Sequence, residues 1–276
     1  FKVGRKIRGL NSIKNNDSGY LWPYIKIDLN ESLYGQTALS NLLNFNLFEE
    51  ALRLLPKQKK GIYLQENQGW EFGLIQAWKA KGHDNLIGVP HSTVRFWDLR
   101  YFFDSRSYNG QLPMPNQVAV NGSLMRKSYI TGGYQGRKLV DVEALRYNYL
   151  NTDKKKNCKD LDSEYFIVLV LGDYRTVNTH FQMRILEEAF SRFSSNLKLI
   201  VKPHANCPII SSDYPELEME VTMESVSTLL PKSNIAFTSN VTSAAIDAYC
   251  SNVPVISILN PNTLNMSPLM GIEGVE

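Results

Sequence analysis

The stretch Glu164 to Leu171, EYFIVLVL, decides the fold, because aromatic and β-branched residues follow one another in it without polar interruption after Tyr165. A half-exposed strand would alternate apolar with polar residues, so this run is typical of a strand buried on both faces of a parallel sheet. Outward from it, the pattern predicts a helix over 179–193, strands over 197–201, 234–237 and 253–259, and a helix over 242–249. This alternation predicts βαβ units and a doubly wound α/β sheet.

The first half of the chain is also α/β in pattern but less regular. The expected elements are a mostly helical stretch over 33–55, strands over 61–65, 85–89, 117–121 and 138–142, and helices over 70–81 and 123–131. The charged segment Asn151 to Ser163 lacks apolar periodicity, as expected of a linker between domains at 1–150 and 164–276. We therefore expect two Rossmann-like domains facing a cleft. Phe1 in place of an initiator methionine indicates a trimmed chain or a fragment, with a truncated second domain.

Charge and composition exclude several classes of protein. The 30 Lys and Arg against 27 Asp and Glu give a net charge of +3, too mild for a nucleic-acid-binding protein. Three cysteines without CxxC or CxxH spacing argue against a disulfide framework and a structural zinc site, and they favour a reducing cytoplasm. No uncharged apolar run is long enough to cross a bilayer, although a pI near 8.6 is compatible with peripheral attachment to a membrane.

Ligands of open parallel sheets bind beyond the carboxyl ends of the strands, so residues that follow strands are the site candidates. In the second half these candidates are Gly172, Asp173, Lys202, His204, Thr238, Ser239, Asn240, Thr242 and Ser243. Lys202-Pro203-His204 brings a cation and an imidazole to the sheet edge, where they suit a phosphate oxygen. A histidine satisfied by a neighbouring carbonyl is the alternative.

The segment from Thr238 to Ser243 opens a predicted helix. Its hydroxyls, the free backbone N–H groups and the positive end of the helix dipole can bind an anion. Plain N-capping by Ser239 or Asn240 is a compatible alternative. Gly172 either allows the close approach of a ligand or is an ordinary turn glycine.

The first half supplies the candidates for catalysis, Glu66, His91, Asp98, Asp141 and Glu143, and one cation, Arg95. Glu66 lies between a strand and a helix, so it is either a general acid or base or a helix cap. Arg95 and Asp98 are also spaced for an ordinary i,i+3 ion pair. Asp141 and Glu143 alternate with valines, which puts both carboxylates on one face of a strand, as cleft acids or as solvated charges.

Several common catalytic motifs are missing from the sequence. There is no GxxxxGK[ST] loop, no GxGxxG after a strand, no GxSxG elbow and no HExxH. Their absence argues against P-loop ATPases, dinucleotide enzymes, serine hydrolases and zinc proteases. Asp160-Leu161-Asp162 lies in the linker instead of ending a strand, which weighs against a metal-dependent transferase.

Two Rossmann-like halves, the strand ending in Lys202-Pro203-His204 and the helix start at Thr238-Ser239-Asn240 resemble the GT-B glycosyltransferases. More narrowly, they resemble bacterial sialyltransferases and Kdo transferases, which use CMP-activated sugars. Two departures are the reversed Pro-His order, with Ala205 following it, and a Thr-Ser pair in place of Ser-Ser. The runs LQENQGWE, GVPHSTVRFWDLRYF and VAVNG…LVDVEALRY are similar to surface-carbohydrate biosynthesis proteins of O-antigen (lipopolysaccharide) and capsule loci. The similarity spans about residues 30–260.

The resemblance implies a metal-independent glycosyltransferase without a cofactor. It would move an acidic nonulosonic or Kdo-type sugar from a CMP donor, bound by the C-terminal domain, to a growing surface glycan, bound by the N-terminal domain. It implies that His204 and the helix start at Ser239 hold the nucleotide phosphate, and that Arg95 or His91 pairs with the sugar carboxylate. Glu66 or another of the acids would act as base in an inverting reaction or as nucleophile in a retaining one.

Alternatives remain open at this point. A GT-B enzyme with a UDP- or GDP-sugar donor would share nearly all these features. A non-catalytic protein that binds a nucleotide or glycan is a second alternative, and a phosphotransferase acting on CDP-linked polyols is a third. The sequence leaves the oligomeric state undetermined.

Overall fold

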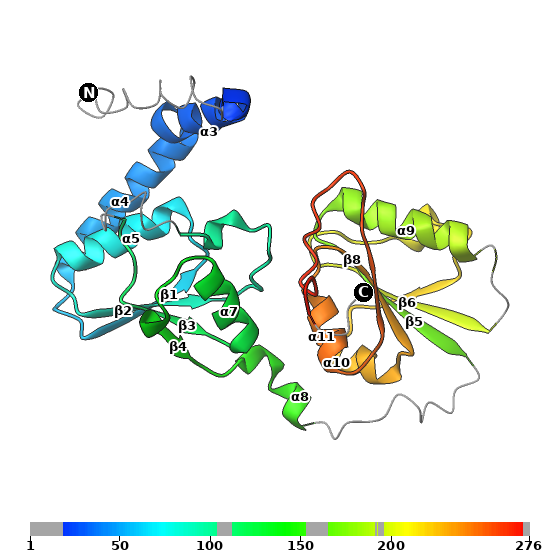
Figure 1. The fold of residues 1–276 in the computed structure, drawn as a ribbon. Coiled ribbons are helices and arrows are strands. Elements are labelled where there is room, and N and C mark those ends of the chain that lie inside the picture. Colours follow the sequence, from blue (N-terminus) through cyan, green and yellow to red (C-terminus); the bar gives the residue numbers. More distant parts are fainter. Residues whose placement is uncertain (1–18, 104–111, 153–164, 191, 193–195, 273–276) are drawn as a thin grey trace. The chain divides into compact units, whose positions relative to one another are not determined.

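The computed structural model describes residues 19–103, 112–152, 165–190, 192 and 196–272, which form two separate sheets (Figure 1). The expected linker therefore lies outside the described residues, apart from Asn151 and Thr152. The described residues divide into two compact units, 19–89 with 112–118, and 90–103 with 119–152, 165–190, 192 and 196–272. The four-stranded sheet contributes strands to both units, whereas the five-stranded sheet belongs to the second.

The first sheet has the order β1-β2-β3-β4, and β2 and β3 are parallel. Its strands are β1 (Lys60–Gln65), β2 (Asn85–Pro90), β3 (Gln117–Val120) and β4 (Leu139–Asp141). The helices in this part of the chain are η2 (Gly19–Leu21), α3 (Trp22–Tyr34), α4 (Gln36–Leu54), α5 (Gly69–Ala80), η3 (Leu99–Tyr101), α7 (Ser123–Thr131), η4 (Gly136–Lys138), η5 (Leu145–Tyr147) and α8 (Tyr149–Thr152).

The helix predicted over 33–55 is wrong in one respect, because Gly35 ends one helix and precedes another. The backbone of Gly35 is extended, and its N–H bonds the carbonyls of Asn30 and Glu31 at the end of α3. Beyond it, α4 packs on α5, and Trp78 and Ile75 of α5 form a buried cluster with Tyr63 of β1. None of the described helices is long and apolar enough to cross a membrane.

The second sheet is parallel throughout, with the order β7-β6-β5-β8-β9, which confirms the predicted doubly wound α/β arrangement. Its strands are β5 (Phe166–Leu171), β6 (Leu197–Lys202), β7 (Met219–Val221), β8 (Ile235–Ser239) and β9 (Val255–Ile258). Its helices are α9 (Thr176–Phe190), η7 (Ser211–Asp213), α10 (Val226–Leu229), η8 (Leu230–Lys232) and α11 (Ala244–Cys250). The chain builds outward from β5 through β6 to β7 and then crosses to β8 and β9. The strand order therefore reverses between β5 and β8.

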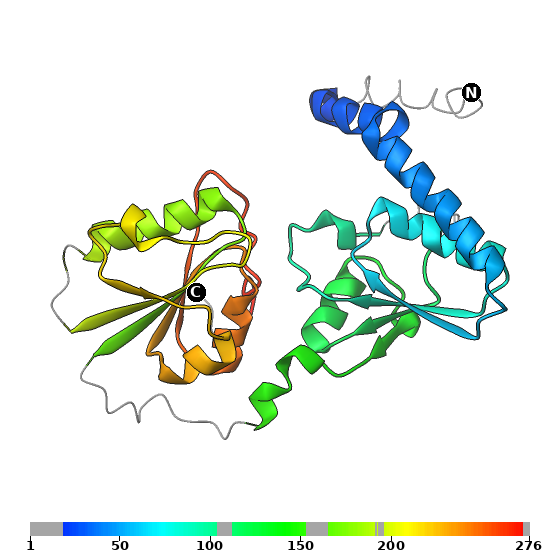
Figure 2. The ribbon, with the colours of Figure 1, turned by 180° about the vertical axis from the view of Figure 1, so that it is seen from behind.

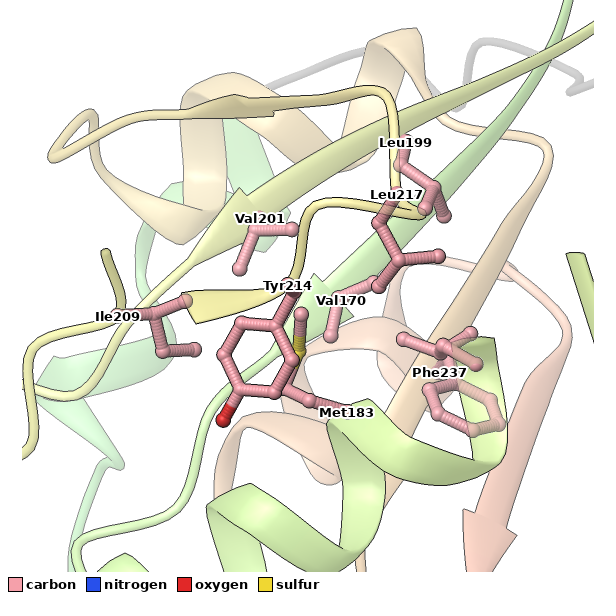
Figure 3. Close-up of a cluster of buried hydrophobic side chains, with 9 residues drawn as sticks. Val170, Met183, Leu199, Val201, Ile209, Tyr214, Leu217 and Phe237 are labelled. Atoms are coloured by element: carbon pink, nitrogen blue, oxygen red, sulfur yellow. The ribbon is translucent and has the colours of Figure 1, made fainter. Parts of the chain in front are cut away.

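Apolar residues cover both faces of the second sheet, as the run in β5 predicted. α9 lies over one face, and α10 and α11 lie over the other (Figures 1 and 2). On the α9 face, Met183 extends from the helix into a cluster with Val170, Val201 and Phe237 of three strands (Figure 3). The alternate residues of the same strands, such as Leu171, pack with Leu229, Leu230 and Ala248 on the opposite face. Burial of both faces fixes the register of the strands.

We predict that Met183→Ala lowers the free energy of unfolding by about 2–5 kcal/mol, because it leaves a cavity at a side chain with no solvent exposure. The control is Val177→Ala on the same helix, where the side chain is 73% exposed and the change should stay below about 0.5 kcal/mol. Urea denaturation followed by circular dichroism measures both. Equal losses in the two variants would contradict the packing described.

Candidate functional site

The register of the second sheet brings the ends of three strands to one level. Leu171 of β5 lies opposite Lys202 of β6 on one side and Thr238 of β8 on the other. The residues that follow, Asp173 and those around His204 and Ser239, therefore share the carboxyl edge of the sheet. In parallel sheets, the crevice beside a reversal of strand order is where ligands bind, and here that crevice is between β5 and β8.

Asp173 is the centre of the contacts at this edge, and it has no exposure to solvent. One carboxylate oxygen accepts from the backbone N–H of Arg175 (2.9 Å). The other accepts from Asn178 Nδ2 (3.0 Å) and from Ser239 Oγ (2.5 Å). The carboxylate thus ties the end of β5 to the first turn of α9 and to the end of β8.

The hydroxyls expected to hold an anion are engaged within the protein. Ser239 Oγ donates to Asp173, and Thr238 Oγ1 lies 2.8 Å from Ser257 Oγ. Thr242 Oγ1 accepts from the N–H of Ala244 at 3.4 Å. The helix predicted over 242–249 begins two residues later, at Ala244, and has only seven residues. Ser239 therefore precedes the helix by a short loop and does not cap it.

A small recess opens between α9 and the loops that follow β8 and β9. It encloses about 190 Å³, including space open to solvent, and it is lined by Asn178, Phe181, Gln182, Ser239, Asn240, Ile258 and Asn260. Its place at the β5–β8 reversal makes it the candidate subsite of this sheet. The lining residues that the sequence analysis did not single out are Asn178, Phe181, Gln182, Ile258 and Asn260. Gln182 Nε2 donates to two strand carbonyls, Leu171 O at 3.2 Å and Phe237 O at 3.0 Å.

His204 and Lys202 lie on the other side of β5. The His204 side chain is exposed, its Nδ1 accepts from the N–H of Asn206 (3.1 Å), and its ring meets that of Tyr174 edge-on with the centroids 6.2 Å apart. With β5 between them, the ends of β6 and β8 are separated by two strand spacings, roughly 10 Å. Packing explains why residue 172 is a glycine, because a Cβ at Gly172 would lie only 3.1 Å from His204 N and 3.2 Å from Pro203 Cα.

Arg95 and Asp98 do not form the ion pair that their spacing suggested. Both oxygens of Asp98, a buried side chain, accept from Arg100, at 2.8 Å from Nε and 2.7 Å from Nη2. The Arg95 guanidinium instead donates to the carbonyls of Thr93 (3.3 Å) and Val241 (2.8 Å). Burial lowers the pKa of Arg95 from its usual value.

Glu71, which the sequence analysis passed over, caps the turn that follows β1. Its carboxylate is 1% exposed and accepts from the N–H groups of Glu66 (2.8 Å), Asn67 (3.0 Å) and Gln68 (3.0 Å). Burial raises the pKa of Glu71, and these backbone hydrogen bonds oppose the rise. The alternative role of helix cap considered for Glu66 thus belongs to Glu71, and the signal was the spacing of Gln68 and Glu71 in a capping box. The Glu66 side chain is partly buried at this turn.

The remaining acids lie at the last strand of the first sheet. Asp141 is exposed and forms a bidentate ion pair with Arg126, at 2.9 Å from Nε and 2.8 Å from Nη2. β4 ends at Asp141, so Glu143 lies beyond the strand and the expected strand over 138–142 is too long. Glu143 and His91 are both exposed.

Comparisons with known proteins show the fold of the chain alone. No protein-family model matches the chain, and no curated protein matches its sequence. The S. aureus MnaA–UDP co-structure has a TM-score of 0.50 and 13% identity over 81% of this chain and 64% of that one. The chain has a GT-B-like α/β fold.

Two further solved structures give lower scores. UDP-N-acetylglucosamine 2-epimerase from Rickettsia bellii has a TM-score of 0.43 and 10% identity, covering 80% of this chain and 62% of that one. Anabaena Alr3699/HepE in complex with UDP and glucose has a TM-score of 0.44 and 10% identity, covering 78% and 62%. The chain spans less than two thirds of the length of each of these structures.

We predict that Asp173→Asn lowers the free energy of unfolding by about 1–3 kcal/mol, because the new NH₂ group would face a buried donor and accept nothing. Asp213→Asn, at an exposed aspartate of η7, is the control and should leave stability nearly unchanged. Both are measured by urea denaturation. An unchanged midpoint for Asp173→Asn would show that its carboxylate does not hold the strand ends.

Proposed function

We propose that the chain is a glycosyltransferase that takes its sugar from a uridine nucleotide donor. The observation that carries this proposal is the recess beside the β5–β8 reversal of strand order in a GT-B-like α/β fold. Among the three solved structures reported above, the one with the highest TM-score is titled as a co-structure with UDP. This likeness supports a uridine nucleotide over a cytidine nucleotide. The CMP-sugar donor that the resemblance implied has less support, because the hydroxyls of Thr238 and Ser239, which would hold it, form hydrogen bonds to other protein groups.

In the proposed reaction, a hydroxyl of a growing glycan attacks the anomeric carbon of the donor sugar. The bond from that carbon to the nucleotide phosphate breaks, the UDP leaves with its electron pair, and a protein base takes the hydroxyl proton. We propose Glu66 for the base. Glu66 follows the carboxyl end of β1, and its side chain is partly buried.

Nucleotide selectivity tests the donor class. We expect UDP at a hundredfold excess over its dissociation constant to raise the melting temperature of the chain by about 5 °C, with smaller shifts for CMP, CDP and GDP. Thermal-shift titration measures this, and uridine without phosphates serves as the control. A CMP-selective rise would restore the acidic-sugar alternative, a GDP-selective rise would move the donor to guanosine nucleotides, and no rise with any nucleotide would refute nucleotide binding.

Glu66→Gln tests the base. We expect it to slow the release of UDP from UDP-sugars by about 10²–10⁴-fold while leaving the affinity for UDP within twofold. Glu50→Gln on α4, where the carboxylate is exposed and pairs with Arg53, is the control and should keep full turnover. A UDP-release rate near that of the unmodified chain would remove Glu66 from the mechanism. If the unmodified chain and the variant bind UDP equally well and neither releases UDP from UDP-sugars, a non-catalytic binding protein is favoured instead.

A further inference from the structure

Helix α4 carries apolar side chains on two opposite sides. On one side, Phe48 and Leu52 pack into the buried cluster with α5, and Phe45 lies against Gly73 of α5. On the other side, leucines spaced by four and seven residues share the outward surface of the helix. These side chains, each at least 58% exposed, form the leucine face of Leu39, Leu43, Leu47 and Leu54. Apolar residues on both sides of a helix indicate that the outward side meets a partner.

The leucine face is nearly neutral. No charged residue occurs between Gln36 and Phe48. Glu50, on the same side of the helix, forms a bidentate ion pair with Arg53 at 2.8 and 2.9 Å. The hydrogen bond and charge of Arg53, and more weakly the charge of Lys81, lower the pKa of Glu50. Lys81 therefore lies within electrostatic reach of this side of α4.

Lysines follow the leucine face where α4 ends and β1 begins. The backbone N–H groups of Asp84 and Asn85 donate to the carbonyls of Gln58 (2.9 Å) and Lys59 (3.2 Å), so the loop before β1 lies beside the loop before β2. Both loops lie at the amino ends of their strands. Together they present the exposed side chains of the lysine edge, which consists of Lys57, Lys59, Lys60 and Lys81.

Positive charge is in excess at the lysine edge. Lys57 pairs with Asp84 at 2.8 Å, whereas Lys59 and Lys60 form no ion pair within the described part of the chain. Residues 49–60 and 79–84 hold six Lys or Arg against three Asp or Glu, a net charge of +3 that equals the charge of the whole chain. Exposed lysines without acidic partners attract an anionic surface.

Area and charge together decide which partner fits. A leucine at this exposure offers roughly 60 Å² of apolar surface, so the leucine face offers about 250 Å², well below the roughly 800 Å² per partner of a stable dimer. A nucleic acid matches the lysines but leaves the leucines in water. An anionic bilayer matches both, because leucines enter between the lipid headgroups while lysines stay at the charged surface.

We propose that the leucine face and the lysine edge bind the surface of a bilayer that contains anionic lipids. In this arrangement α4 lies along the bilayer and does not cross it. The lysine edge is at the amino end of β1, whereas Glu66 follows the carboxyl end of the same strand, roughly 20 Å away. The contact with lipid therefore leaves the carboxyl edge of the first sheet unoccupied.

Co-sedimentation of the full chain with vesicles tests the proposal. The probes are vesicles of phosphatidylglycerol and phosphatidylcholine in equal parts, and vesicles of phosphatidylcholine alone. We expect binding to the anionic vesicles to be at least about tenfold tighter and to weaken as salt is added, because salt screens the lysines.

The double variant Lys59→Glu with Lys60→Glu tests the lysine edge. It should weaken binding to the anionic vesicles at least about tenfold. The matched control is Lys127→Glu with Lys138→Glu, at exposed residues of α7 and η4, which changes the total charge equally and should stay within about threefold. Residues 1–18, with five further Lys or Arg, are the same in both variants, so they do not account for a difference.

Leu43→Ser tests the leucine face. It should weaken binding about fivefold, because one apolar side chain no longer enters the headgroup layer. Leu124→Ser on α7, where the leucine is exposed to nearly the same extent, is the control and should leave binding within about twofold.

Three outcomes would overturn the proposal. They are no binding to the anionic vesicles, equal effects of a variant and its control, and a chain that sediments as a dimer without lipid and as a monomer after Leu43→Ser. The last outcome would assign the leucine face to a second copy of the chain. Vesicle binding is measured without nucleotide, so its failure leaves the uridine-nucleotide function standing, and a failure of UDP binding leaves the lipid surface standing.

Discussion

The buried carboxylate of Asp173 is the interaction on which the carboxyl edge of the second sheet depends. A charge removed from water must be compensated by donors, and here the donors come from the turn after β5, the first turn of α9 and the end of β8. The three segments are distant in sequence but are held by one group. The edge is thereby held together by contacts within the protein.

The second sheet was largely predictable, because burial on both faces leaves a continuous apolar run such as that of β5. Two of its short elements, β7 with three residues and α10 with four, were not predicted, because so few residues show no periodicity. The break at Gly35 was missed for a related reason. The predicted helix began at residue 33, so it included only the last two residues of α3, and the break is seen only in the extended backbone of Gly35.

The location of the site followed from the strands, whereas the contacts of its residues did not. A parallel sheet puts every residue that follows a strand at one edge, so Asp173 and Ser239 could be selected from sequence. The partner of Asp98 could not be predicted from sequence, because Arg95 and Arg100 are both close to it along the chain. Only the folded loop shows that Asp98 pairs with Arg100. Gln182 left no local signal, since its role depends on two carbonyls contributed by other strands.

The bridge from Gln182 to the carbonyls of Leu171 and Phe237 has a consequence for how the molecule can vary. The side chain of Gln182 belongs to a helix, and it joins the two neighbouring strands β5 and β8. The length of this side chain therefore sets the distance between α9 and these strands. A shorter amide at this position would draw the helix toward the sheet by about one carbon–carbon bond, roughly 1.5 Å. The spacing between α9 and these strands can thus change with this one side chain while the apolar interior stays the same.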